Sequence, residues 1–340
     1  MQYQFVQQLF STPLDIIGDI HGEIDALNQL LTHLGYDESG NHPQNRKIIF
    51  VGDLCDRGPD SLAVIRRVKK LIENKNAQCV IGNHELNLLI SSKREGNGWF
   101  FGSPHIDDEK NFLSKTASVE DKNWILDFLS GLPIALESEE LRIVHACWHQ
   151  AAIDCLKQSD FSSILTAYNY FQQQIKQQLE LSGIAKQAQG EIACHTLNDA
   201  QQQPPLLHNL AQKELAEQMQ NPIKVISSGA EYLVTQPLYA GGKWRMIDRL
   251  AWWDHYTDHI PVVVGHYWRN FKTTAEKQGL FKHIDATQWF GANKNVFCVD
   301  YSVGKRFLDR AQQQKFSSQL AALRFPEKIL MLESGQTYST

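Results

Sequence analysis

Three short polar blocks near the start of the chain contain the residue types that bind metal ions. They read Gly18-Asp-Ile-His-Gly22, Gly52-Asp-Leu-Cys-Asp-Arg-Gly58 and Gly82-Asn-His-Glu85. Each block follows a short apolar run, so we expect each at the carboxyl end of a strand, where open α/β sheets place their sites. One such block alone would more often be a turn or a helix cap. The order and spacing of all three favour a common site.

The side chains of these blocks, together with two later histidines, can form two neighbouring cation sites. The predicted metal ligands are Asp19, His21, Asp53, Asn83, His145 and His266. Asp19 and His21 are close enough in the chain for one turn to present both to the same cation. Asp53 is the natural bridge, because a carboxylate can bind two cations and Asp53 lies between the two groups of ligands. These oxygen and nitrogen donors suit two divalent metal ions, with manganese preferred and iron or zinc also suitable.

Two divalent cations roughly 3.5–4 Å apart would support hydrolysis of a phosphate ester or anhydride. They lower the pKa of a shared water, bind phosphate oxygens and neutralise the charge that develops during in-line attack. His84 can protonate the leaving oxygen, and Asp56 can hold His84 in the required tautomer and orientation. Arg57 offers a planar fork of donors to two phosphate oxygens. The predicted catalytic residues are therefore His84, Asp56 and Arg57.

The elements that must position these residues alternate between strand and helix. An apolar run precedes each block, and apolar residues at helical spacing follow it, as in Ile24, Leu27, Leu30, Leu31 and Leu34. This β-α-β-α-β order predicts a mainly parallel sheet covered by helices. Further strands are predicted over 141–146, 261–266, 295–300 and 328–333.

Residues 151–221 differ from the rest of the chain in composition. Glutamine becomes very frequent, as in Phe171-Gln-Gln-Gln-Ile-Lys-Gln-Gln-Leu, and strand signals disappear. Leu, Ile, Phe and Ala recur often enough to favour a mostly helical insertion over a disordered glutamine-rich linker. We therefore predict a single domain over residues 1–340 with this insertion inside it.

The bulk composition narrows the classes of function. The chain has 340 residues, of which 42% are hydrophobic, as is typical of a soluble globular protein. Its net charge of −5 gives no bulk electrostatic case for nucleic acid binding. No apolar run approaches the roughly 18 residues of a membrane span, and the N-terminus has no signal-peptide pattern. The six cysteines form no C-x-x-C pair, so we interpret them as reduced thiols. We expect a cytoplasmic protein with no nucleic acid or membrane partner.

The ligand pattern resembles that of the calcineurin-like metallophosphoesterases, and within them the phosphoprotein-phosphatase class. That class includes serine/threonine protein phosphatases and symmetrical diadenosine tetraphosphatases. Its pattern GD-x-HG, GD-x-x-DRG and GNHE matches the three blocks, and its later histidines match His145-Ala146 and Gly265-His266. The resemblance implies a four-layer α/β/β/α sandwich with the metals at one edge, and it implies that Asp53 belongs to both metal sites.

Residues near the second late histidine are candidates for substrate binding. The resemblance implies a second phosphate-binding arginine between the late histidines, for which Arg245 and Arg249 are candidates. Tyr301 follows the strand at 295–300, where family members often place a polar or aromatic residue beside the site, and core packing is the alternative. An aromatic cluster either packs the core, which we prefer, or stacks a nucleobase or phosphotyrosine ring beside the metals. The cluster consists of Trp244, Trp252, Trp253, Tyr256, Tyr267 and Trp268.

These interpretations lead to three candidate functions. The first is a phosphomonoesterase of protein-phosphatase type, because Arg57 in an intact Asp-Arg-Gly motif suits a terminal phosphate dianion. The alternative is a dinucleoside-polyphosphate hydrolase, acting for example on diadenosine tetraphosphate, with the aromatic cluster around a nucleobase. In both cases the partner is a phosphorylated substrate, either a phosphoprotein or a nucleotide. The third is an inactive scaffold that binds partners through residues 151–221; it is disfavoured because all predicted ligands and His84 are present.

Overall fold

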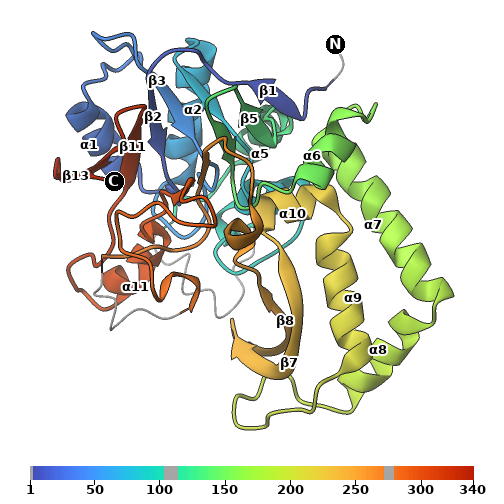
Figure 1. Ribbon diagram of the computed structural model, residues 1–340. Helices are drawn as coiled ribbons and strands as arrows, with labels where there is room; N and C mark the ends of the chain where they lie inside the picture. Colours follow the sequence, from blue (N-terminus) through green and yellow to red (C-terminus); the bar gives the residue numbers. More distant parts are fainter. Residues whose placement is uncertain (1–2, 103–113, 272–278) are drawn as a thin grey trace.

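Two β-sheets form the centre of the molecule, and helices cover them (Figure 1). The computed structural model describes residues 3–102, 114–271 and 279–340. The sandwich of two sheets flanked by helices confirms the fold class predicted from the sequence. No helix within the described ranges is both long and apolar enough to cross a membrane.

The first sheet has six strands. Their order is β13 (Thr337–Ser339), β12 (Ile329–Leu332), β11 (Ala321–Phe325), β2 (Leu14–Ile17), β3 (Lys47–Phe50) and β4 (Ala77–Cys79). Strands β2, β3 and β4 run parallel, so their carboxyl ends lie at one edge of the sheet. Strands β11, β12 and β13 extend the other side of β2 as an antiparallel addition.

The second sheet has five strands. Their order is β1 (Val6–Gln8), β5 (Ala135–Glu137), β6 (Arg142–Val144), β9 (Val262–Val264) and β10 (Val296–Cys298). Strands β6, β9 and β10 run parallel, although a long stretch of chain separates β6 from β9. The carboxyl ends of β6 and β9 are therefore neighbours in space.

Neighbouring residues of one strand belong to different cores, because side chains alternate across a sheet. Ile16 packs with Val263 and Phe297 in the core between the two sheets. Ile17 belongs instead to a larger core that includes Leu27, on the outer face of the first sheet. All four of these strand residues are fully buried. Burial of one such side chain contributes roughly 1.5–3 kcal/mol, so the two cores fix the register of the strands that carry the site.

The helices that follow the strands begin and end at recognisable signals. Helix α1 (Ile24–Leu34) ends at Gly35, which has a φ of 96°. Helix α2 (Ser61–Glu73) begins after Asp60, whose side chain accepts a hydrogen bond of 2.9 Å from the backbone N–H of Ala63. The other helices outside residues 151–228 are α3 (Asn83–Leu89), α4 (Gly98–Phe101), α5 (Val119–Ser130) and α11 (Arg306–Ala311), with short 3₁₀ turns at Trp252–His255, Gly279–Phe281 and Val303–Lys305.

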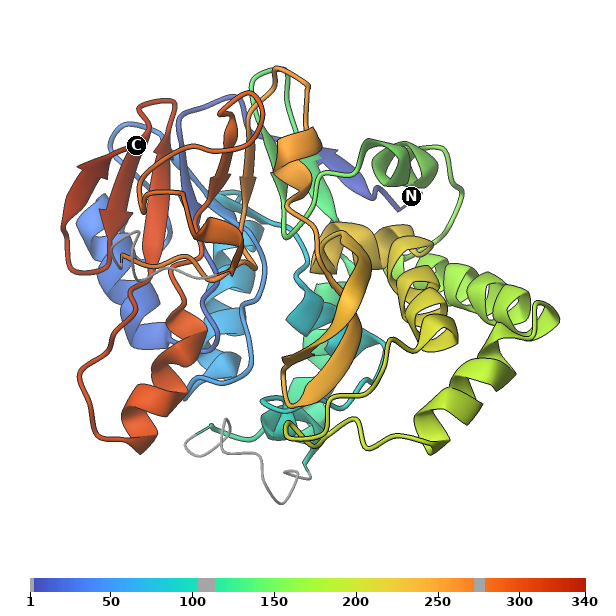
Figure 2. The same cartoon turned by 60° about the horizontal axis from the view of Figure 1, so that its bottom comes forward.

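Residues 151–221 are mostly helical, and two further strands follow them. The helices are α6 (Gln150–Lys157), α7 (Ile164–Leu181), α8 (Ile184–Ala193), α9 (His208–Met219) and α10 (Pro222–Ser228). Strands β7 (Glu231–Ala240) and β8 (Lys243–Arg249) form a separate antiparallel hairpin, which the sequence did not predict. Figure 2 shows this hairpin beside α9, which it contacts along its length. The division into one domain with an insertion at 151–221 stays a prediction.

Candidate metal centre and active site

The predicted ligands meet where the carboxyl ends of parallel strands from both sheets converge. The first sheet supplies Asp19, His21, Asp53 and Asn83, and the second supplies His145 and His266. The two sheets touch directly at this point, because the backbone N–H of His266 donates to Asp19 Oδ2 at 3.1 Å. A Cβ atom on Gly265 would lie 2.1 Å from Asp19 Oδ1, so only glycine permits this approach.

The carboxylate of Asp53 lies at the centre of the cluster. Its Oδ2 is 3.2 Å from Nε2 of His145, 3.8 Å from Nε2 of His21 and 3.9 Å from Nε2 of His84. All four side chains are buried. One oxygen surrounded by several ring nitrogens has the position that a bridging ligand requires.

Two of these histidines have their tautomer fixed by the other ring nitrogen. Nδ1 of His21 donates to the carbonyl of Cys55 at 3.0 Å, and Nδ1 of His145 donates to the carbonyl of Val51 at 2.7 Å. In their neutral form these rings present Nε2 as an acceptor toward Asp53, which also only accepts. Burial opposes but the Asp53 carboxylate raises the pKa of His145, so the neutral form of His145 calls for a cation in place of the proton. Acceptors that converge in this way fit a cation between them, and backbone carbonyls that orient the rings are the usual support for metal ligands.

Asn83 lies next to the two histidines of the second sheet. Its Oδ1 is 2.9 Å from Nδ1 of His266 and 3.1 Å from Nε2 of His145. Within the described residues, the buried Nε2 of His266 has no hydrogen-bond partner. Burial, followed by the positive charge of Arg249, holds the pKa of His266 well below its usual value. The ring is therefore neutral, which is the form that binds metal ions.

Several buried carboxylates lie close together at the centre. Burial, together with the negative charges of Asp300 and Asp53, raises the pKa of Asp19 well above its usual value. Burial likewise raises the pKa of Asp300 and of Glu85. Carboxylates this close together disfavour each other's ionised form unless positive charge is present. The electrostatics of the site therefore fit the divalent cations that its donor set suggests.

Two groups of side chains could each hold a metal ion. They are His21, Asp53 and His84, and Asp53, His145 and His266, with the ligand atoms of each group within 4.8 Å of one another. Because Asp53 belongs to both, the arrangement is that of a dinuclear site. Cations bound here would lower the pKa of a water molecule and neutralise charge on a phosphate. The prediction placed Asp19 in the first group, whereas the geometry brings His84 close to it. The donors suit manganese, iron and zinc alike.

His84 is held by Asp56 on the side away from Asp53. Nδ1 of His84 donates to Asp56 Oδ2 at 2.6 Å, and the indole N–H of Trp99 donates to Asp56 Oδ1 at 2.6 Å. Both carboxylate oxygens of Asp56 are thus engaged, so the ring of His84 has a fixed tautomer and direction. Its Nε2 faces the metal centre, where a leaving group would need a proton.

Arg57 spans the open side of the centre. Its Nη1 donates to Nε2 of His21 at 3.3 Å, and its Nη2 donates to Nε2 of His84 at 3.1 Å. The guanidinium lies over the ring of Trp268, 5.0 Å from the ring centroid. Arg57 has a φ of 68°, an uncommon conformation that aims its side chain at the site. A planar fork in this place is suited to two oxygens of one phosphate.

Two buried acids support the centre, and the sequence analysis gave neither of them a role. Glu85 accepts hydrogen bonds from the backbone N–H groups of Asp53 and Leu54, each at 2.8 Å, and of Gly82 at 3.0 Å. It thereby ties the loop of Asp53 to the start of α3. Asp300 accepts from the backbone N–H of Trp268 at 2.9 Å. The available signal for Asp300 was its position after β10, the same strand-end position that identified the other acids.

The two candidate phosphate-binding arginines lie on the same strand, β8, where both act on the carboxylate of Glu231, and they line different cavities. Nε of Arg245 donates to the carbonyl of Ala240 at 3.0 Å, and its side chain lines a cavity of about 430 Å³ that reaches Asn83. The guanidinium of Arg249 lies 5.9 Å from the ring centroid of Tyr267 and acts on the pKa of His266. Both arginines are thus near the centre, and Arg249 is the one coupled to a predicted ligand.

Tyr301 and most of the aromatic cluster belong to the packed interior. Tyr301 is buried, its hydroxyl donates to the carbonyl of Ala286 at 2.5 Å and its ring stacks on Phe271. This is the core-packing alternative for Tyr301. The cluster members Trp252, Trp253, Tyr256 and Tyr267 are part of the larger core. Trp244 is also buried, whereas Trp268 is half-buried beneath Arg57.

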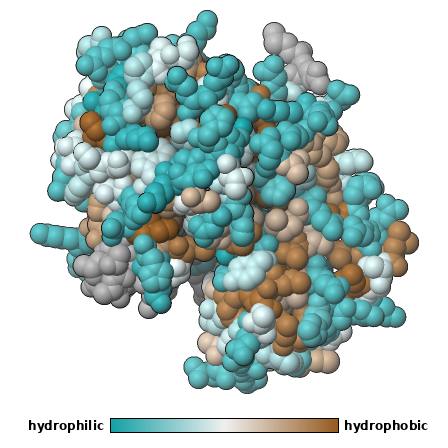
Figure 3. Space-filling model, viewed as in Figure 1, coloured by the Kyte–Doolittle hydropathy of each residue, from teal (hydrophilic) through white to brown (hydrophobic). Residues whose placement is uncertain are grey.

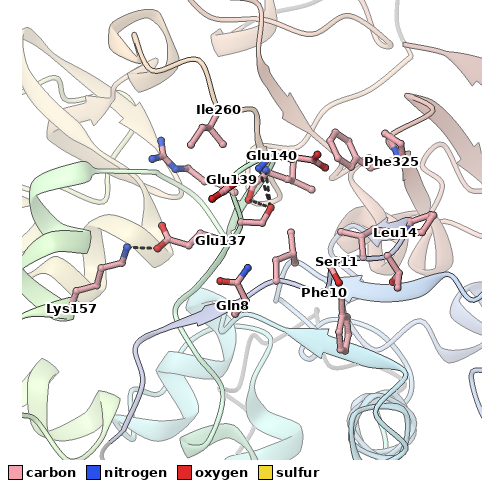
Figure 4. Close-up of a pocket in the computed structure, with 17 residues that line it drawn as sticks. Gln8, Phe10, Ser11, Leu14, Glu137, Glu139, Glu140, Lys157, Ile260 and Phe325 are labelled. Atoms are coloured by element: carbon pink, nitrogen blue, oxygen red, sulfur yellow. Dashed lines mark hydrogen bonds and ion pairs between the residues drawn. The ribbon is translucent and has the colours of Figure 1, made fainter.

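A larger cavity, of about 870 Å³, lies away from the metal centre (Figure 4). Leu14 and Arg142, the first residues of β2 and β6, line it, so it opens at the amino ends of strands whose carboxyl ends carry ligands. Glu137, Glu139 and Glu140 lie along one side, and Lys157 pairs with Glu137. None of the predicted site residues lines it. The volume of a cavity therefore does not identify the reactive site here.

Comparison with known proteins finds similarity to phosphatases that act on dinucleotides. The chain is 50% identical over 136 residues to the asymmetrical bis(5'-nucleosyl)-tetraphosphatase PrpE of Oceanobacillus iheyensis. This alignment covers 39% of this chain and 54% of that protein. The chain is also 46% identical over 137 residues to the symmetrical bis(5'-nucleosyl)-tetraphosphatase of Ralstonia nicotianae. That alignment covers 40% of this chain and 42% of the relative. The chain thus spans about half the length of the curated relatives it matches.

A solved structure of similar size gives a weaker likeness. The cold-active protein-tyrosine phosphatase of a Shewanella species aligns with 99% of this chain and 82% of that chain, at a TM-score of 0.46 and 14% identity. We draw no conclusion from a score at this level. The decisive match is to the family model of the calcineurin-like phosphoesterases, which covers residues 12–182, half of the chain. On this match, and with the ligands of its motifs gathered around Asp53, the chain belongs to the calcineurin-like phosphoesterase family.

Proposed function

We propose that this chain is a metal-dependent hydrolase of dinucleoside polyphosphates. The observation that carries the hydrolytic part is the position of Asp53, whose Oδ2 lies within 3.9 Å of the Nε2 atoms of His21, His84 and His145. The names of the two relatives described above, both bis(5'-nucleosyl)-tetraphosphatases, support the substrate class. The sequence alone favoured a phosphoprotein; these comparisons favour the alternative that it offered.

The side chains divide the work of such a reaction. Asp53 holds the ligands of both sheets together, and the remaining predicted ligands complete the two cation sites. Arg57 binds two oxygens of the phosphoryl group with its fork and so holds it in line for attack. In its imidazolium form, with the Arg57 donors turned to the phosphoryl oxygens, His84 supplies the Nε2 proton to the departing phosphate oxygen, while Asp56 keeps the ring in place through Nδ1. Arg249 neutralises charge on the remaining phosphates of the chain.

A phosphoprotein substrate is the second candidate, and one observation favours it. Arg57 lies between His21 and His84, where a terminal phosphate dianion would fit as well as an internal phosphoryl group. A catalytically inactive scaffold is disfavoured, since the ligand cluster and the His84–Asp56 pair are complete.

A substrate panel with manganese-loaded protein tests the proposal. Diadenosine tetraphosphate, ATP, a phosphoserine peptide and p-nitrophenyl phosphate should be compared by kcat/KM. We expect the dinucleotide to be preferred by at least tenfold over the peptide. Chromatography of the products then separates symmetrical cleavage, which gives two ADP, from asymmetrical cleavage, which gives ATP and AMP. A preference for the phosphopeptide would overturn the proposed substrate. If none of the four compounds is turned over, the assignment of this chain as an enzyme is wrong.

A further inference from the structure

An aromatic pocket of about 380 Å³ lies directly beside the metal centre. Its volume is within the range of roughly 300–1,000 Å³ that small-molecule sites occupy. The side chains that line this aromatic pocket include Tyr232, Asp248, Arg249, Tyr267, Trp268 and Phe281. Tyr267 and Trp268 follow the predicted ligand His266 in the chain, so the pocket adjoins the cluster around Asp53.

The rings of the aromatic pocket are of two kinds, fixed and exposed. Phe281 is buried and stacks on Trp253 with an interplanar angle of 4°, and Tyr267 is buried against the same tryptophan edge-to-face. These rings form a rigid apolar wall. Tyr232 on β7 is 45% exposed, which is unusual for so large a side chain beside a cavity. It can stack on a planar ligand without losing a contact of the core.

Polar groups are placed at both ends of the aromatic pocket. Asp248 is the cross-strand neighbour of Tyr232 in the hairpin, so the two side chains share one face and Asp248 offers an acceptor next to the exposed ring. Arg249 lies at the other end, where its charge acts on His266. Trp268 joins the pocket to the centre, because Arg57 lies over its ring. The pocket therefore runs from an aromatic outer end to a cationic inner end at the reactive site.

We propose that the aromatic pocket binds the nucleobase of the nucleotide whose phosphate chain reaches the metal centre, with Tyr232 as its stacking residue. The inference rests on the proposed dinucleotide substrate and adds the place where the base is recognised. A base has a π-face and amine donors, which match an exposed aromatic ring and the Asp248 carboxylate. Its phosphates are anionic, which matches Arg249 and Arg57 at the inner end. The surface over the β7–β8 hairpin gathers apolar residues, as Figure 3 shows.

Substitutions of Tyr232 test the proposal against a matched control. Tyr232→Ala removes the stacking ring, whereas Tyr232→Phe retains it. Tyr170→Ala is the control, because Tyr170 on α7 has a similar exposure of 48% and lines neither the aromatic pocket nor the ligand cluster. The first readout is the ratio of kcat/KM for diadenosine tetraphosphate to kcat/KM for p-nitrophenyl phosphate, which has no base. The second readout is the affinity of the protein for ADP and for pyrophosphate, measured by calorimetry.

Stacking of one base predicts a selective loss in Tyr232→Ala. The kcat/KM ratio and the preference for ADP over pyrophosphate should each fall by about fivefold or more. Tyr232→Phe should restore both, and Tyr170→Ala should change neither. An unaltered ratio and unaltered ADP preference in Tyr232→Ala would overturn the base site while leaving a dinucleotide hydrolase in place. If the wild-type protein instead prefers phosphopeptide, the proposed function fails, and the base site fails with it unless ADP still outcompetes pyrophosphate through Tyr232.

Discussion

Nδ1 of His84 donates a hydrogen bond of 2.6 Å to Asp56, whose other oxygen accepts from Trp99. The pair fixes one ring nitrogen and directs the other toward Asp53. This arrangement favours His84 as a proton donor. The distances alone would also permit His84 to be a metal ligand, because it lies within the first group of possible metal ligands.

His84→Asn should lower kcat while the protein keeps its metal ions. Asparagine cannot deliver a proton to the leaving oxygen, and loss of a general acid costs roughly 10²–10⁴ in rate. Metal content measured by mass spectrometry and kcat on the dinucleotide decide the matter together. If the variant loses a metal ion in proportion to its activity, His84 is a ligand and the assignment as acid is wrong.

Loading with manganese should raise the melting temperature of the protein. The ligands come from both sheets, so bound ions would join the sheets and relieve the repulsion among Asp19, Asp53 and Asp300. Binding at about 100 times the dissociation constant stabilises by about 2.7 kcal/mol. Calorimetry with manganese and with chelator measures the difference. Asp53→Asn should abolish this rise and activity together, and an undiminished rise in that variant would contradict the bridging role.

Glu85→Gln should destabilise the metal-free protein by about 1–3 kcal/mol. The carboxylate accepts from four backbone N–H groups of the site, at Asp53, Leu54, Cys55 and Gly82. A glutamine amide places a donor against donors at one of these positions. Urea unfolding in chelator gives the free energy of unfolding. Glu73→Gln, at an exposed position on α2, serves as the control and should change it by less than about 0.5 kcal/mol.

Arg249→Ala should raise KM for the dinucleotide more than Arg245→Ala does. Arg249 lies against Tyr267 and acts on His266, whereas Nε of Arg245 is held by the carbonyl of Ala240. A charge-assisted contact to phosphate contributes about 1.5–3 kcal/mol, which corresponds to a change of roughly tenfold to a hundredfold. Steady-state kinetics on both variants would reveal the order. The reverse order would assign the phosphate to Arg245 instead.

The sequence predicted the parts of the site that depend on local pattern. Each ligand follows an apolar run, and strand ends of parallel sheets meet at one edge, so the convergence of Asp53, Asn83 and His145 follows from one-dimensional information. The central place of Asp53 among the ligands could be inferred from its position between two ligand groups in the chain. A mainly parallel sheet covered by helices followed from the alternation of strands and helices, whereas the two-sheet sandwich was implied by the resemblance to the metallophosphoesterases.

Other features depend on partners that are distant in the chain. The role of Glu85 arises from the backbone of Asp53 and Leu54, which no pattern of residue types shows. Asp300 has a strand-end position in the sequence, but its approach to Asp19 depends on the packing of the two sheets. The β7–β8 hairpin escaped prediction because β7 has no regular alternation of buried and exposed residues. The aromatic cluster could not be divided from sequence into the rings that fill the core and the one, Trp268, that lies under Arg57.

The β7–β8 hairpin has one further consequence. The two sheets hold the ligands, but the hairpin belongs to neither sheet and presents Tyr232 and Asp248 on one face and Arg245 on the other. On the proposed assignment of the aromatic pocket, reaction chemistry and base recognition belong to different pieces of the chain. Replacement of this hairpin by one of another sequence should then change the preferred phosphate compound while the ligand cluster stays as it is.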